Sequence, residues 1–224
     1  MSAHTSSPAK DAGKPVAFVS AQALRERMHD AVNDPHLRTS FRGAMDFLMA
    51  KRSAQFPDES ELASLRTLSE GIRQYSLARL PDLLEQLEAK LTANGVQVHW
   101  AETPDEANAI MLGIARRHEA KLIVKGKSMV SEEIEFNHAM EAAGVGALES
   151  DMGEYIVQLA GEKPSHIIMP AIHKTKEQIA RLFADKVPGV DYTDNVDALI
   201  RIGRDVLREK FEEAEIGLSG VNFA

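Results

Sequence analysis

Cysteine is absent from all 224 residues, and this absence removes several kinds of chemistry. The chain can form no disulfide, offers no thiol nucleophile, and cannot hold zinc or an iron–sulfur cluster through cysteine. Long apolar runs are also missing, since every run is far shorter than the ~20 residues of a membrane helix. No basic segment followed by a long apolar stretch opens the chain, so no secretory signal is recognisable and a cytoplasmic location is expected.

A surplus of basic residues is lacking too. The chain has 26 Lys and Arg against 34 Asp and Glu, which gives a formal net charge of −8 with histidine neutral. Nucleic-acid binding needs a basic surface, so this balance argues against it. Hydrophobic residues make up 44% of the chain, which is ordinary for a soluble protein and sufficient for one large core or two small ones.

Three segments of the chain differ in pattern. Residues 1–20 are rich in Ser, Ala, Lys and Pro and are expected to form a disordered leader. Residues 21–94 repeat apolar side chains at three- and four-residue steps, as at Leu65 and Leu68, which predicts a helical arm. Residues 95–224 alternate short apolar runs with helical patterns, which predicts a separate α/β domain.

Short strands and helices are expected to alternate along this last segment. The predicted strands are 96–100, 122–124, 145–148 and 166–169, and the predicted helices start at Thr103, span about 132–143, start at Thr175 and span about 193–214. Such alternation is typical of a mainly parallel sheet flanked by helices, so the predicted fold class is α/β. Residues 221–223 resemble the start of a further strand, so we expect the domain to be incomplete at its C-terminal end.

Polar residues follow each predicted strand and form the candidate site. Ligands of open parallel sheets bind beyond the carboxyl ends of the strands, so side chains there are expected to converge. These segments are Ala101-Glu102, Lys125-Gly126-Lys127-Ser128, Glu149-Ser150-Asp151 and Pro170-Ala171-Ile172-His173.

Gly126, Lys127 and Ser128 match the end of a phosphate-binding P-loop. The partner glycine that this motif needs earlier in the chain is missing, because Lys121 stands in its place, so nucleoside-triphosphate binding is excluded. A milder interpretation is an anion site, in which the turn from Lys125 to Ser128 binds a phosphate or carboxylate. The equally weighted alternative is a solvated turn whose serine only caps the next helix.

Asp151, Glu154 and His173 are the candidate catalytic residues. The two carboxylates could act as acid and base, or hold a metal with His166 or His173, but no tight ligand spacing supports a metal site and none is predicted. Ser128, Asp151 and His173 follow the chain order of a hydrolase triad, yet the second glycine of a nucleophile elbow is missing after Ser128. Alternatively, Asp151 caps a helix and Glu154 is solvated or pairs with a lysine.

Several longer stretches closely resemble one known family. They are QVHWA at 97–101, KGKSMVSEEI at 125–134, ESDMGEYIVQL at 149–159, PSHIIMPAIHKT at 164–175 and GLSGVNF at 217–223. Together they are similar to the lactate-utilisation protein B family, the iron–sulfur subunit of a multi-protein L-lactate oxidation system. The resemblance extends from about residue 40 to the end of the sequence.

The resemblance implies a fold similar to the sugar-phosphate isomerase and CoA-transferase group, and electron transport during oxidation of L-lactate to pyruvate. In the family a later, ferredoxin-like region carries the cysteines for 4Fe–4S clusters. This sequence reaches Ala224 without a cysteine, so we expect no cofactor in this chain and no activity of the chain alone.

Partners follow from the same resemblance. They are the sister subunits of A and C type, with a small carboxylate substrate possible near Lys125, Lys127 and Ser128 and a homo-oligomer possible as well. Two alternatives stay open. One is a stand-alone enzyme that binds a sugar phosphate or CoA ester, and the other is a non-catalytic scaffold that docks sister subunits through residues 21–94.

Overall fold

The computed structural model describes residues 20–162 and 164–220 of the chain. The protein divides into two structural units. One unit contains the described residues of 20–41 and of 102–220, and the other is Arg42–Ala101. The boundary near Phe41 lies inside a helix.

Helices account for the first part of the described chain. They are α1 (Ala21–Asn33), α2 (Pro35–Gln55), α3 (Glu59–Ala78) and α4 (Leu80–Ala93), and none of them has a buried residue. Asp58 starts α3 by accepting hydrogen bonds from the backbone N–H groups of Ser60 and Glu61. Pro81 lies in the first turn of α4, so the long helical stretch breaks where the sequence predicts.

The predicted strand at 96–100 is wrong, because these residues pair with no strand in the part of the chain that the structure describes. The Val96 N–H donates to the Leu91 carbonyl at the end of α4, and Trp100 Nε1 donates to Glu88 Oε1 at 3.0 Å. Both contacts tie the segment to α4 instead of to a sheet. The alternation of apolar and polar residues there predicted a half-buried strand, but Val96 and Trp100 are 46% and 57% exposed.

The unit that contains the residues after Glu102 has a small parallel sheet, and we call this unit the α/β unit. Its strands are β1 (Leu122–Lys125), β2 (Gly146–Glu149) and β3 (Ile216–Leu218), in the order β2-β1-β3. The register places Lys125 beside Glu149 on one side and beside Leu218 on the other. The predicted strands at 122–124 and 145–148 are thereby confirmed, as is the α/β class with a parallel sheet and flanking helices.

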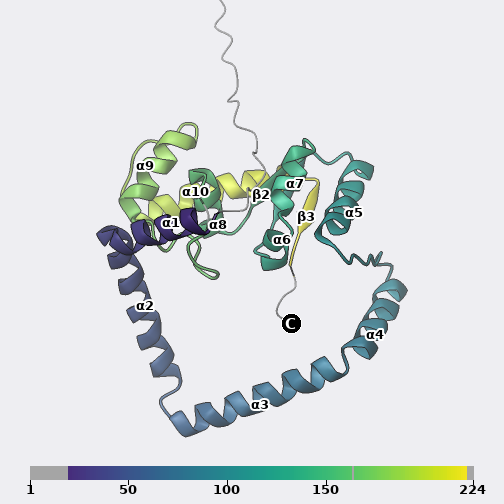
Figure 1. The fold of residues 1–224 in the computed structure, drawn as a ribbon. Helices are drawn as coiled ribbons and strands as arrows, with labels where there is room; N and C mark the ends of the chain where they lie inside the picture. The colour runs from purple at the N-terminus through teal and green to yellow at the C-terminus, as the bar shows by residue number, and fades with distance from the viewer. Residues whose placement is uncertain (1–19, 163, 221–224) are drawn as a thin grey trace, which may run out of the picture. The chain divides into compact units, whose positions relative to one another are not determined.

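In the described chain, six further helices precede, follow or connect the strands. They are α5 (Pro104–Arg117), α6 (Met129–Glu133), α7 (Phe136–Ala142), α8 (Met152–Ala160), α9 (Lys176–Lys186) and α10 (Val196–Glu213). Figure 1 shows α5, α6 and α7 gathered at one end of this unit, and α8, α9 and α10 at the other. Each group has its own apolar cluster, one centred on Phe136 and Met140 and one on Phe183 and Leu199.

A break divides the single helix predicted at 132–143 into α6 and α7. Glu135 has a positive φ of 53°, a left-handed conformation that interrupts a helix. Asn108 of α5 donates its side-chain N–H to the Ile134 carbonyl at 2.7 Å, so this carbonyl is satisfied outside a helix ladder. The break therefore has a tertiary cause that helical periodicity cannot reveal.

The predicted strand at 166–169 is also wrong. His166 Nδ1 accepts hydrogen bonds from the backbone N–H groups of Ile168 and Met169, so these groups face a side chain and not a neighbouring strand. The third strand of the sheet is instead β3, where the sequence analysis predicted no strand. The further strand expected at 221–223 lies outside the described residues.

Candidate functional site

Lys125 and Glu149 form a buried ion pair where β1 and β2 end. The two residues are only 1% and 5% exposed, and Lys125 Nζ lies 2.7 Å from Glu149 Oε1. The parallel register brings them side by side. Lys125 also donates to Ser131 Oγ at 3.1 Å, and Asn137 Nδ2 donates to Glu149 Oε1 at 2.8 Å. Such additional partners offset part of the free energy lost when two charges leave water.

Two oxygen atoms next to this ion pair have no partner among the described residues. They are Glu149 Oε2 and Asn137 Oδ1, both inaccessible to solvent. The assignment of the Asn137 amide is fixed, because its nitrogen donates to the other oxygen of Glu149. A buried acceptor without a donor costs about 1–3 kcal/mol, so these atoms mark the point where the network is incomplete.

Lys127 and Glu154 form a second ion pair on the same side of the sheet. Glu154 is 3% exposed, whereas the side chain of Lys127 remains 29% exposed. Asp151 caps α8, since its carboxylate accepts from the Glu154 N–H at 3.1 Å. The structure thus shows the helix cap and the lysine pair that the sequence offered as alternatives to catalytic roles for Asp151 and Glu154.

Ser128 caps the short helix α6. Its Oγ accepts from the Ser131 N–H at 3.2 Å, and the Ser131 hydroxyl donates back to the Ser128 carbonyl at 2.8 Å. Gly126 donates its N–H to the Leu218 carbonyl of β3 at 2.7 Å. A side chain at Gly220 would overlap Ser128, so the segment after β3 packs directly on this turn. The polar groups of the turn from Lys125 to Ser128 therefore bond to other groups of the protein.

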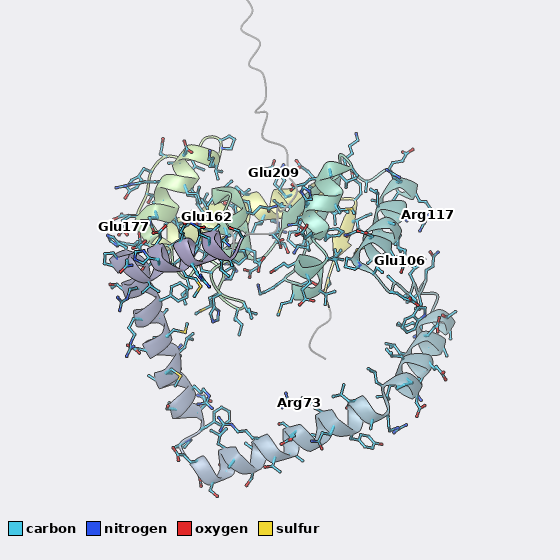
Figure 2. The ribbon with its side chains drawn as sticks, viewed as in Figure 1. Arg73, Glu106, Arg117, Glu162, Glu177 and Glu209 are labelled. Atoms are coloured by element: carbon cyan, nitrogen blue, oxygen red, sulfur yellow. The ribbon has the colours of Figure 1, made fainter. Side chains whose placement is uncertain are left out.

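His173 belongs to a different cluster, in the loop between α8 and α9. Its Nδ1 lies 2.7 Å from Ser165 Oγ, and its Nε2 lies 2.8 Å from a carboxylate oxygen of Glu162, which is labelled in Figure 2. Lys174 also pairs with Glu162. Burial raises the pKa of Glu162, but hydrogen bonds from Lys174 and His173 outweigh burial and leave this pKa below its ordinary value.

Within the described residues, no hydrogen bond joins Ser128, Asp151 and His173 to one another. The structure therefore brings together Lys125, Lys127, Ser128 and Glu154, with Asp151 at the adjacent cap. His173 is not part of this group, because its two ring nitrogens contact Ser165 and Glu162. The rim segment Ala101-Glu102 was expected at the same edge, but no strand precedes it, and Ala101 belongs to the Arg42–Ala101 unit.

A pocket of about 470 Å³ opens beside the two ion pairs. Lys125 is the only lysine or arginine among its described lining residues. Its carboxylates are Glu132, Glu135, Glu149, Glu154 and Glu162. Sequence reasoning singled out Glu149 and Glu154 but missed the others, together with Asn137 and Gln158. Gln158 follows Glu154 by one helical turn, and this spacing was a signal that could have found it.

Glu132 has a pKa above its ordinary value. Partial burial is the main cause, and the negative charge of Glu154 adds to it, whereas Lys127 and Lys125 act in the opposite direction. The carboxyl group therefore keeps a proton more readily than a free glutamate does. This raised pKa of a pocket-lining carboxyl group is a feature that sequence spacing alone did not suggest.

Two further observations concern metals and membranes. Among residues 20–162 and 164–220, no three His, Asp or Glu side chains are arranged to hold a metal ion. In the same ranges, no helix combines the length and the apolar character that crossing a bilayer requires.

Comparisons with known proteins show what this chain is similar to. It is 42% identical over 207 residues to lactate utilization protein B of Bacillus pumilus (strain SAFR-032). It is 39% identical over 206 residues to the proteins of the same name from Bacillus cereus (strain AH820) and Bacillus thuringiensis (strain Al Hakam). These alignments cover 92% of this chain but only 43–44% of the relatives, so the chain spans less than half of their length.

No solved structure matches this chain. The family described as LUD domain matches residues 84–224, which include both ion pairs, the helix caps and the pocket. The match covers more than half of the sequence and agrees with the resemblance carried by its motifs. The chain therefore belongs to the LUD-domain family.

Proposed function

We propose that this chain acts in lactate utilisation, as the front portion of a subunit that takes part in the oxidation of L-lactate to pyruvate. The observation that carries the proposal is the 42% identity to a lactate utilization protein B across 92% of the chain. The match includes the segments that form the buried ion pairs, so it concerns the candidate site as well as the general fold.

In this proposal, electron transfer through 4Fe–4S clusters is assigned to a longer protein of the length of the relatives, and not to these 224 residues. Such clusters are bound by cysteine thiolates, and none of the 224 residues is a cysteine. The residues of this chain therefore do not fit a cluster, and any cluster ligands would have to come from outside this sequence. In the proposal, this chain alone does not oxidise lactate, and A- and C-type sister subunits supply the remaining components.

Lys127 is the residue that we assign to a small carboxylate substrate. Its side chain remains partly exposed, whereas that of Lys125 is buried against Glu149. A substrate carboxylate could share Lys127 with Glu154 without opening the core. Asp151, Glu154 and His173 stay candidate catalytic residues, although the hydrogen bonds of His173 lead to Glu162 and Ser165.

Growth on L-lactate as the sole carbon source tests the proposal. A strain that lacks the gene should fail to grow, and the intact gene should restore growth. Lys127→Met should restore it poorly, while Lys121→Met, which alters an exposed lysine just before β1, should restore it fully. The purified Lys127→Met protein must unfold cooperatively for the comparison to count. Normal growth of the deletion strain on L-lactate would refute the proposed role.

Docking of sister subunits is a second function that one observation favours. Helices α1 to α4 contain no buried residue, and α3 presents Leu68, Ile72 and Tyr75, each about 60% exposed. Apolar side chains at this spacing share one helix face and suit packing against a partner helix. Leu68→Ser combined with Ile72→Ser should abolish co-migration with the sister subunits in gel filtration. Unchanged co-migration would remove the docking proposal.

The alternative of a stand-alone enzyme for sugar phosphates or CoA esters gains no support from the geometry. Both lysines of the turn contact glutamates, and Ser128 caps its own helix. A phosphate would have to displace these partners to bind there.

A further inference from the structure

The pocket beside the ion pairs combines an apolar wall with a polar one. Phe136 of α7 and Val157 of α8 line it, and both side chains are almost completely buried. Glu149 at the end of β2 and Asn137 of α7 supply two of its polar groups. The volume of about 470 Å³ lies within the range of small-molecule sites.

Two buried oxygen atoms of the pocket lining lack a hydrogen-bond donor among the described residues. Glu149 Oε2 and Asn137 Oδ1 are buried acceptors that have no partner among the described residues. They belong to side chains that are already hydrogen-bonded to each other, so one ligand group with several N–H or O–H bonds can reach both. An ionised carboxylate group offers no such donors, so it would leave both atoms unsatisfied.

Charge selects among the possible donors. The described lining residues include five glutamates, one histidine, His138, and one lysine, Lys125, which is already paired with Glu149. Lys127 offsets Glu154 from outside the pocket. Glu132, Glu135 and Glu162 remain at the rim, of which Glu162 is engaged by Lys174 and His173. The pocket is therefore acidic, and a positively charged donor is favoured over a neutral hydroxyl group.

We infer that this pocket binds a small organic ammonium cation, whose N–H groups donate to Glu149 Oε2 and Asn137 Oδ1 and whose carbon chain lies against Phe136. An ammonium group has three donors and no acceptor, which matches two open acceptors beside an acidic rim. The proposal goes beyond the lactate-utilisation role and does not depend on it. L-lactate is an anion, so it has the wrong charge for this pocket, and its proposed contact Lys127 does not line it.

Ligand titration of the intact 224-residue chain tests the inference. The probes are n-propylammonium chloride, 1-propanol, sodium propionate and sodium L-lactate, added at constant ionic strength and followed by amide chemical shifts in ¹⁵N-labelled protein. Propylammonium should shift residues of α6, α7, the end of β2 and α8, and it should bind roughly tenfold tighter than 1-propanol. Propionate and lactate, whose proposed contact is Lys127 beside Glu154, should leave α7 and the end of β2 unshifted.

Three single variants show whether propylammonium binds in this pocket. Glu132→Gln removes one rim charge and should weaken propylammonium binding about two- to fivefold, the size expected for a partly exposed charge pair. Asn137→Ala removes an open acceptor and should weaken binding further. Glu141→Gln, on the exposed surface of α7 and outside the pocket lining, is the matched control and should bind as the unaltered chain does.

The same spectra show whether each variant is folded, so loss of binding can be told from loss of structure. The inference is overturned if propionate shifts α7 and the end of β2 as strongly as propylammonium does. Propylammonium shifts scattered over the acidic surface, equal effects of Glu132→Gln and Glu141→Gln, or no shift by any probe at millimolar concentration would also overturn it.

Discussion

At the scale of single residues, the ion pair between Lys125 and Glu149 should have the largest effect on stability. Lys125→Met would leave the Glu149 carboxylate buried without its cation, which should lower the free energy of unfolding by about 3–5 kcal/mol. Urea denaturation measures this loss. The double variant Lys125→Met/Glu149→Leu removes both charges and should recover much of the stability. A single variant as stable as the unaltered chain would show that the pair contributes little.

Glu132 should make stability depend on pH. Burial and the nearby charge of Glu154 raise its pKa in the folded chain. Its favourable contribution is therefore present below the pKa of the unfolded chain, about 4.3, and is lost as the pH rises through the raised value. Glu132→Gln should be more stable than the unaltered chain at neutral pH, and the difference should vanish near about pH 4. Denaturation series at several pH values check this, and a difference that does not vary with pH would contradict it.

The sequence allowed the helix caps among the site residues to be predicted, but not the ion-pair partners of the lysines. Asp151 and Ser128 precede helices, where caps are common, and the structure shows both as caps. The choice of Glu149 for Lys125 and Glu154 for Lys127 depends on strand register and on the placement of α8, which link residues far apart in the chain. Asn137 and Glu162 entered the site only through such tertiary placement.

At the scale of elements, the cap of α9 gives a direct prediction. Thr175 accepts from the Gln178 N–H, and the Gln178 side chain accepts from the Thr175 N–H, so a complete capping box starts this helix. Thr175→Ala should lower the free energy of unfolding by about 1 kcal/mol. Thr175→Ser keeps a hydroxyl at this position and should lose much less. Equal losses in thermal unfolding of the two variants would show that the hydroxyl is not what matters.

Helices were predicted better than strands, for a physical reason. A helix satisfies its backbone hydrogen bonds within its own residues, so caps such as Thr103 and Thr175 define it locally. A strand needs a partner, and residues 96–100 and 166–169 find their partners in α4 and in His166. β3 is only three residues long and follows α10 closely, so no period could identify it.

At the scale of the whole molecule, the position of the apolar core predicts which part folds alone. Both apolar clusters draw their residues from Met111 to Leu218, and α1 to α4 contribute no buried residue. A fragment of residues 102–224 should therefore unfold cooperatively, with a Tm within a few degrees of the full chain. Calorimetry of the two proteins checks this. A fragment without a cooperative transition would show that the earlier helices are needed for the core.

The order of the strands has a consequence for synthesis on the ribosome. β1 is the central strand, but one of its neighbours is β3, and the hydrogen bond from Leu122 N–H to Glu215 spans 93 residues. At bacterial to eukaryotic translation speeds, roughly 5 to 20 s pass between the emergence of these two segments. The nascent chain therefore waits with one side of its central strand open. During that interval, a chaperone or a neighbouring nascent chain competes for the edge that β3 later occupies.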